Sequence, residues 1–181
     1  YVAYRGVLRY LLRLLERLNA AFATHVLTVS SDMVGLLQDV SPAIKAQVIL
    51  NGSASGIDLQ AFLPERFSRN AWRQLHGLSD QDLVVAYVGR PERRKGFELV
   101  LRLWAEYLRD KHFKLVLCGP EPGDVLRHLG TMPANVISLG FVNNVPEVLS
   151  GSDLMILPSF HEGLSYACLE AQARSEEHTS E

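Results

Sequence analysis

Residues 83–101, LVVAYVGRPERRKGFELVL, decide the fold of this chain. The apolar, β-branched run over 83–89 predicts a buried strand, and it leads straight into a basic turn. From Lys95 the apolar residues recur with helical spacing, which predicts a helix over 95–110. A strand, a short connection and a helix in this order are the unit from which parallel α/β sheets are built.

The same alternation continues along the chain. Further strands are expected at 114–119, 135–140 and 154–159, and helices at 64–75, 123–130, 145–151 and 164–173. The strand segments are continuously apolar, as strands covered on both faces are. We therefore predict the α/β class, with a parallel sheet and helices on both of its faces.

The sequence before this region has a different organisation. A helix is predicted over 2–22, a strand over 25–30, a helix from a cap at Ser31 or Asp32 to about Asp39, and a strand over 46–52. The segment GSASGID follows and reads as a joint between domains. We place the boundaries at 1–58 and 59–173, with 174–181 as a separate tail.

The composition limits the classes of function that this chain can have. The net charge of −2 gives no sign of nucleic-acid binding. The two cysteines, in apolar surroundings, favour buried thiols in a reducing compartment, and the six histidines show no metal-site spacing. Arg5, Arg9, Arg13 and Arg17 interrupt the first helix and exclude a membrane span there. This basic stripe is either a solvated face or a contact with an anionic membrane or substrate.

Ligands of open parallel sheets bind beyond the carboxyl ends of the strands. At the first such end, Gly89 permits close backbone approach, Arg90 offers a fork of donors and Lys95 a mobile charge, and the helix that follows adds its positive end. This combination suits a phosphate or diphosphate, although an exposed basic turn fits this segment equally well. It is neither a P-loop nor a GxGxxG motif.

A second strand end carries PSFHEGLSYACLE, residues 158–170. The amides of Gly163, Leu164 and Ser165 are expected at a helix mouth, where free N–H groups attract an anion. Glu162 in the loop suits contact with sugar hydroxyls, or it merely complements the helix dipole. A third end, GFVNN at 140–144, offers an aromatic ring and two amides to a planar base.

Taken together, these segments resemble the retaining GT-B glycosyltransferases of family four. The resemblance covers nearly all of residues 1–173 and rests on HVLTVS, VILNGSASGIDLQAF, YVGRPERRKGFELVL, LVLCGP, VISLGFVNNVPEVLSGSDLMILPS and EGLSYACLEAQA. It implies a Rossmann-like donor-binding domain over 59–173, preceded by the end of an acceptor-side domain. The NGSASGID variant looks most like enzymes that build surface polysaccharides on lipid carriers.

The resemblance also implies roles for single residues. Arg90 and Lys95 would hold the diphosphate and Glu162 would face the donor sugar, which makes these three the catalytic residues. The donor-binding residues would be Gly89, Glu170 at the ribose, Gly163, Leu164 and Ser165 at the phosphate, and Val142 at the base.

The implied reaction transfers a sugar with retention from a nucleotide-diphosphate sugar, a UDP-sugar by expectation, to a lipid-linked or polysaccharide acceptor. Neither a metal nor a cofactor is expected. The expected location is the cytoplasm, with peripheral contact to the membrane. A sugar-nucleotide epimerase on the same fold and a non-catalytic nucleotide-sugar sensor remain alternatives.

The sequence departs from the family pattern at both ends. The first domain is represented only by its last elements, and the strand expected after EAQA is absent. We therefore expect a fragment that is inactive alone. The final residues 174–181, RSEEHTSE, read like the translation of a common sequencing adapter, and we expect them to be non-native.

Overall fold

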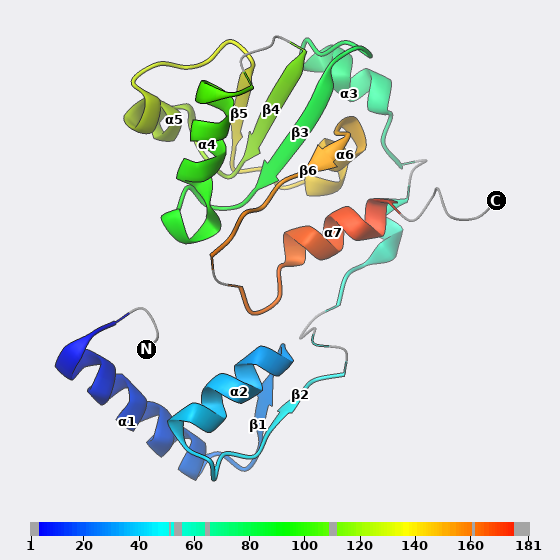
Figure 1. Cartoon of the computed structure of the whole chain (residues 1–181). Helices are drawn as coiled ribbons and strands as arrows, with labels where there is room; N and C mark the ends of the chain where they lie inside the picture. Colours follow the sequence, from blue (N-terminus) through cyan, green and yellow to red (C-terminus); the bar gives the residue numbers. More distant parts are fainter. Residues whose placement is uncertain are drawn as a thin grey trace. The chain divides into compact units, whose positions relative to one another are not determined.

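The computed structural model describes residues 4–50, 52, 56–63, 66–108, 112–160 and 162–175. The chain divides into two compact units, Tyr1–Gly56 and Ile57–Glu181. The division falls two residues before the boundary expected at 58. Figure 1 shows a small unit of helices and two strands, and a larger unit built on one sheet.

The first unit contains α1 (Gly6–Phe22), β1 (Val26–Thr28), α2 (Ser31–Val40) and β2 (Ala46–Val48). The two strands pair in parallel. Ser30 caps α2, because its backbone is extended and its hydroxyl accepts a hydrogen bond from the Met33 amide at 3.3 Å. The expectation of a cap at Ser31 or Asp32 is therefore wrong, since both lie inside the helix.

Helix α1 begins at Gly6, four residues after the predicted start at residue 2, and residues 2 and 3 of the prediction lie outside the described residues. Two arginines of the basic stripe bind the end of α2: Arg13 donates to the Asp39 carbonyl and Arg17 to the Val40 carbonyl at 2.6 Å. Cations at a helix C-terminus are favourable, because its last carbonyls lack helical partners. Half of the stripe is thus structural, a role that neither of our two interpretations included.

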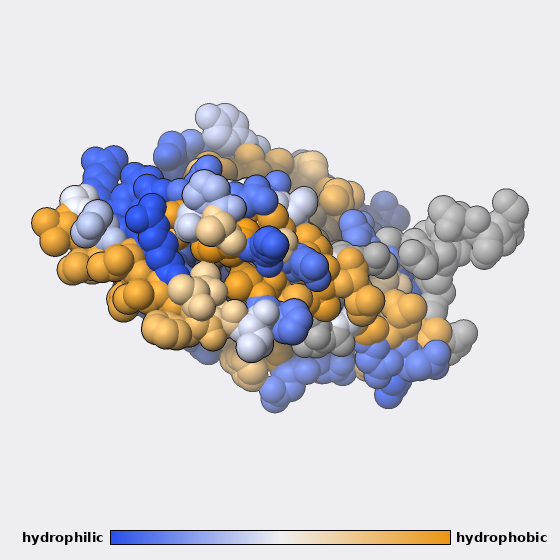
Figure 2. Space-filling view, turned by 90° about the horizontal axis from the view of Figure 1, so that it is seen from below, coloured by the Kyte–Doolittle hydropathy of each residue, from blue (hydrophilic) through white to orange (hydrophobic). Residues whose placement is uncertain are grey.

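Helix α1 also exposes many apolar side chains. None of its residues is buried, and its exposed apolar side chains are Val7, Leu8, Tyr10, Leu11, Leu14, Leu15, Leu18 and Phe22. In the space-filling view, orange hydrophobic residues are exposed beside blue hydrophilic ones (Figure 2). None of the described helices is both long and apolar enough to cross a membrane.

The second unit holds the alternating elements. They are η1 (Leu59–Phe62), α3 (Arg69–Leu75), β3 (Leu83–Val88), η3 (Arg93–Lys95), α4 (Phe97–Glu106), β4 (Phe113–Cys118), α5 (Pro122–Leu129), β5 (Val136–Gly140), α6 (Val145–Gly151), β6 (Leu154–Met155) and α7 (Tyr166–Ser175). The strands form one parallel sheet in the order β5-β4-β3-β6. The predicted α/β class is confirmed.

Both faces of this sheet are covered. Val85 and Tyr87 of β3 pack with Phe97 and Trp104 of α4, whereas Val84 packs against α3 and α6 on the other face. This follows from the period of two in a strand, which sends alternate side chains to opposite faces. The continuous apolar runs are therefore explained by burial on both sides, with α4 and α5 over one face (Figure 1).

Several predicted boundaries differ from the structure, among them the end of β2 at Val48 instead of residue 52, the start of α3 and the end of β6. The helix expected from residue 64 begins at Arg69, because the Ser68 hydroxyl accepts the Ala71 amide at 3.2 Å and caps it there. The strand expected over 154–159 forms ladder pairs only at 154–155. Beyond Ile156 the backbone turns toward the basic turn, where the Phe160 amide donates to the Arg94 carbonyl at 2.9 Å.

Candidate active site

The carboxyl ends of three neighbouring strands are held together by glycines. The Gly89 amide donates to the Cys118 carbonyl at 3.0 Å, and the Gly119 amide donates to the Gly140 carbonyl at 2.7 Å. Gly119 has φ of +108°, and a Cβ there would overlap the Gly89 carbonyl oxygen. The close approach therefore requires glycine, and it fixes the point from which the loop after β3 departs.

The basic turn after β3 differs in detail from the prediction. Lys95 ends the 3₁₀ turn η3, Gly96 has φ of +72°, and α4 begins only at Phe97. A side chain at Gly96 would overlap the Pro158 carbonyl, so glycine is required where the turn passes under the β6 loop. The expectation of a helix from Lys95 is therefore wrong by two residues at its start.

The same geometry bears on the expected positive helix end. The amides of Lys95 and Gly96 donate to the carbonyls of Glu92 at 3.0 Å and Arg93 at 2.9 Å. These two donors are used inside the turn, so the turn itself offers its cationic side chains to an anion. The first-turn amides of α4 begin only at Phe97.

Lys95 and Glu162 meet although they lie 67 residues apart in the sequence. The Lys95 Nζ lies 2.5 Å from the Glu162 Oε1, and the Ser159 hydroxyl donates to the same oxygen at 2.8 Å. The two paired side chains are 20% and 24% exposed. The structure thus brings together two of the three predicted catalytic residues and adds Ser159, which our sequence analysis missed.

The electrostatics of this pair favour its charged form. Burial alone raises the pKa of Glu162, but the hydrogen bonds from Lys95 and Ser159 and the charges of Lys95 and Arg94 outweigh it and lower that pKa below its usual range. Glu162 is therefore a carboxylate at neutral pH. It neutralises Lys95 in this structure, so an anionic ligand of Lys95 competes with Glu162.

Arg90 is not part of that pair. Its side chain is 80% exposed and lies 3.5 Å from Glu92, which also binds Arg94 at 3.3 Å. An exposed ion pair of this kind contributes little to stability, since solvent screens it. The guanidinium is consequently available to a ligand at small energetic cost.

The second predicted segment forms the start of α7. The Ser165 hydroxyl accepts the Cys168 amide at 3.4 Å, so this side chain caps the helix. Gly163 and Leu164 precede it in the loop. Glu170 lies in the second turn, where burial raises the pKa of its carboxyl. Within the described ranges no group donates a hydrogen bond to that carboxylate, and it does not join Lys95 or Arg90.

The third predicted segment follows β5. Val142 is partly buried and packs against the cluster that contains Trp72 and Val148. Phe141 beside it is 80% exposed. Val142 therefore follows the carboxyl end of β5, with its side chain packed in the core and its aromatic neighbour open to solvent.

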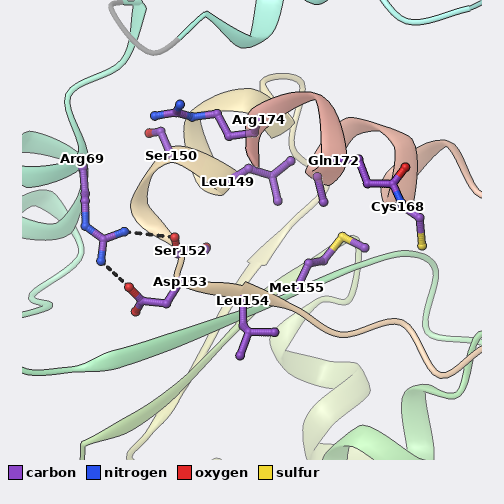
Figure 3. A pocket seen from close by; sticks show the side chains of 11 residues that line it. Arg69, Leu149, Ser150, Ser152, Asp153, Leu154, Met155, Cys168, Gln172 and Arg174 are labelled. Carbon is purple, nitrogen blue, oxygen red and sulfur yellow. Dashed lines mark hydrogen bonds and ion pairs between the residues drawn. The ribbon is translucent and has the colours of Figure 1, made fainter. Parts of the chain in front are cut away.

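A cavity of about 770 Å³ lies away from these residues, beside β6 (Figure 3). It is lined by residues of α3, α6, β6 and α7, among them Leu149, Leu154 and Met155. Arg69 donates to the Ser152 carbonyl at 3.0 Å and pairs with Asp153 at its rim. None of the predicted site residues lines this cavity, and the ion pair at its rim joins α3 to β6. We therefore take the Lys95–Glu162 pair in the strand-end loops as the candidate site.

The described residues contain no cluster of three or more His, Cys, Asp or Glu side chains that would suit a metal ion. The residues at the strand ends are instead a lysine, arginines, hydroxyls and a carboxylate. This donor set suits phosphate and hydroxyl groups, because cations and free amides bind the former and carboxylates accept from the latter.

The fold and the site define a class of protein. Its members have a parallel α/β domain with cationic side chains and a carboxylate at the ends of the strands. The model of the family of glycosyl transferases group 1 matches residues 82–175, which is 94 of the 181 residues. The chain belongs to this family.

Curated relatives agree with this membership. The chain is 27% identical over 170 residues to an uncharacterized glycosyltransferase of Methanocaldococcus jannaschii, covering 88% of this chain and 42% of the relative. It is 30% identical over 139 residues to a UDP-Gal:alpha-D-GlcNAc-diphosphoundecaprenol alpha-1,3-galactosyltransferase of Escherichia coli, covering 72% and 35%. The chain thus spans less than half the length of these relatives.

Solved structures show the same fold. The crystal structure of HepE of Anabaena in complex with UDP and glucose superposes with a TM-score of 0.72 at 20% identity, covering 90% of this chain and 45% of that one. The expected GT-B-type architecture is therefore confirmed at the level of fold.

Proposed function

We propose that the protein transfers a sugar from a nucleotide-diphosphate sugar to an acceptor hydroxyl, with retention of configuration at the sugar. The observation that carries this proposal is the meeting of Lys95 and Glu162 at the carboxyl end of the sheet, 2.5 Å apart. A cation for the leaving phosphate and a carboxylate for the sugar hydroxyls then lie side by side.

The chemistry assigns each residue a task. As the bond to the sugar breaks, negative charge grows on the leaving diphosphate, and Lys95 and Arg90 stabilise it more strongly than they stabilise the bound donor. When the phosphate binds Lys95, the ion pair with Glu162 breaks. Glu162 then accepts hydrogen bonds from hydroxyl groups of the sugar. Glu170 in α7 accepts the ribose hydroxyls, and Gly89, Gly163, Leu164, Ser165 and the backbone of Val142 complete the donor site.

We further propose UDP as the nucleotide. Two similar proteins support this choice: the E. coli relative is named for UDP-galactose, and the Anabaena structure was solved with UDP and glucose. The acceptor that we propose is lipid-linked or polysaccharide, and the name of the E. coli relative, with its diphosphoundecaprenol acceptor, supports the lipid-linked form.

Substitution of the cations tests the transfer. Because we expect this chain to be inactive alone, transfer is measured in a full-length protein that contains it. There, Lys95→Ala and Arg90→Ala should each lower transfer at saturating donor by about 10²- to 10³-fold, the typical effect of losing one donor to a developing oxyanion. Arg102→Ala is the matched control, because this arginine lies on α4, is 69% exposed and pairs with Glu106 of the same helix. Unchanged turnover in both variants would refute the proposed clamp, and analysis of the products separates transfer from isomerisation of the donor.

The proposed location is the cytoplasmic membrane surface, reached through α1. Arg5 and Arg9 are exposed beside the apolar side chains of this helix, a combination that favours anionic lipid. Sedimentation with phosphatidylglycerol vesicles should recover the protein, and Leu11→Glu together with Leu15→Glu should reduce recovery. Equal recovery by phosphatidylcholine vesicles would contradict the preference for anionic lipid, and no loss in the variant would contradict contact through α1.

A further inference from the structure

Tyr87 lies directly beneath the basic turn. Its side chain is fully buried, and its ring packs against Phe97 with 5.8 Å between ring centroids. Its hydroxyl lies 2.8 Å from the Arg90 carbonyl and 3.4 Å from the Lys95 carbonyl. One buried hydroxyl therefore contacts the backbone of both residues that carry the proposed diphosphate cations.

The hydroxyl acts here as a donor. Both neighbours are carbonyl oxygens, which only accept, and the 2.8 Å contact is the stronger because a single O–H proton serves one acceptor well. Burial, followed by the nearby charges of Glu92 and Glu162, raises the pKa of Tyr87, so its proton stays in place throughout the physiological range.

Other contacts also hold the turn, among them the Phe160 amide, which donates to the Arg94 carbonyl at 2.9 Å. Gly89 lies so close that a Cβ there would be 3.3 Å from the Tyr87 hydroxyl, and Gly96 is pressed against the Pro158 carbonyl. Lys95 itself points to Glu162 across the site. Among these contacts, the Tyr87 hydroxyl is the side-chain group that reaches the backbone of both Arg90 and Lys95, beside the two glycine ends of the turn.

We propose that Tyr87 is a positioning residue of the donor site, whose hydroxyl holds the backbone of Arg90 and Lys95 where their side chains meet a nucleoside diphosphate. This inference rests on the proposed function. It assigns to Tyr87 no contact with the ligand, so its removal acts only through the two cations.

Tyr87→Phe removes the hydroxyl and keeps the ring. We expect it to bind UDP about 3- to 10-fold more weakly than the unaltered chain, the range that one neutral hydrogen bond predicts. Binding is measured by calorimetry with UDP, GDP and ADP, and by NMR titration with the matching nucleosides. Uridine, which lacks phosphate, should bind equally to both forms, because the cations do not touch it.

Two further variants sharpen the test. Tyr107→Phe is the control, since Tyr107 is 76% exposed after α4 and its hydroxyl should not affect binding. In a background of Arg90→Met with Lys95→Met, the added Tyr87→Phe should change UDP affinity less than about twofold, because the cations through which it acts are gone.

The outcomes separate the inference from the function on which it rests. An unaltered chain that binds none of the three diphosphates contradicts the proposed function and the inference with it. Binding of UDP that Tyr87→Phe leaves unchanged contradicts the inference alone. So does an equal loss for uridine and UDP, or a Tyr87→Phe chain that no longer folds by circular dichroism, because either makes the hydroxyl a general structural element.

Discussion

Gly96 and Gly130 share a φ of +72° but differ in their surroundings. A methyl group at Gly130 meets no atom within 4 Å, whereas one at Gly96 overlaps the Pro158 carbonyl. Gly130→Ala should therefore lower the free energy of unfolding only by the left-handed strain, about 1–2 kcal/mol. Gly96→Ala should lower it further and weaken donor binding, because the basic turn or the Pro158 loop must shift.

Urea unfolding of the two variants at neutral pH measures this difference. Equal losses of stability would show that the turn under Pro158 yields freely, contrary to the packing in the structure. The sequence pattern placed Gly96 inside the helix predicted over 95–110. Its left-handed conformation was not predicted, because that conformation follows from the loop that passes above it.

At the scale of elements, a buried arginine joins α3 to two strands. Arg73 is 1% exposed, donates to the Gly151 carbonyl at 2.9 Å and the Ser79 carbonyl at 2.9 Å, and pairs with Asp153 at 2.6 Å. Asp153 also accepts the Val84 amide at 2.7 Å. Helix α3 is thereby attached to β3 and to the start of β6.

Arg73→Leu should lower the free energy of unfolding by about 3–5 kcal/mol, because Asp153 loses one of its two cations and the carbonyls that Arg73 binds lose a buried donor. Arg102→Leu is the control, and its exposed pair with Glu106 should contribute at most about 0.5 kcal/mol. Chemical unfolding followed by tryptophan fluorescence measures both. Similar small losses in the two variants would contradict the role of Arg73.

The same network predicts a pH dependence. Burial alone raises the pKa of Asp153, but the Val84 amide, the Arg69 hydrogen bond and the charges of Arg69 and Arg73 outweigh it and lower the pKa in the folded state. Its stabilisation is therefore complete above its unfolded pKa of about 3.9 and is lost as pH falls through the lower folded value.

Unfolding measured between pH 6 and pH 3 should show stability falling with acid, and Asp153→Asn should show a smaller fall. Some slope should remain, because Asp82 and Glu162 also have lowered pKa values. An identical slope in the variant would exclude Asp153 as a contributor.

At the scale of the whole molecule, the two units differ in how much they bury. In the described part of the first unit the buried hydrophobic residues are Val40 and Ile44, whereas the second unit contains three clusters. A small core offsets less of the conformational entropy lost on folding. We therefore expect the first unit to unfold at a lower temperature than the second.

The distribution of tryptophan makes this measurable. Both tryptophans, Trp72 and Trp104, lie in the second unit, so their fluorescence reports that unit alone. Circular dichroism reports α1 and α2 as well. The dichroism transition should begin below the fluorescence transition, and coincident curves would mean that the two units unfold as one.

Local pattern was sufficient for much of the fold. The alternation of strands and helices, the two covered faces of the sheet and the existence of each strand from 83 onward were predicted from periodicity, because spacing of two or of three and four reflects backbone geometry directly. Boundaries failed where a neighbouring hydroxyl decided them, as at Ser30 and Ser68. The turn η1 was missed, since no periodic signal marks four residues.

The candidate site was likewise predicted in part. Parallel topology alone brings the carboxyl ends of the strands to one edge, so the sequence by itself placed Gly89, Arg90, Lys95, Val142 and Glu162 there. Only the tertiary structure decided that Lys95 pairs with Glu162 and that Arg90 does not. It also decided that the Tyr87 hydroxyl binds the Arg90 carbonyl and that the Ser159 hydroxyl binds Glu162. Contacts between residues far apart in the chain depend on how the strands and loops pack, and no local pattern encodes that distance.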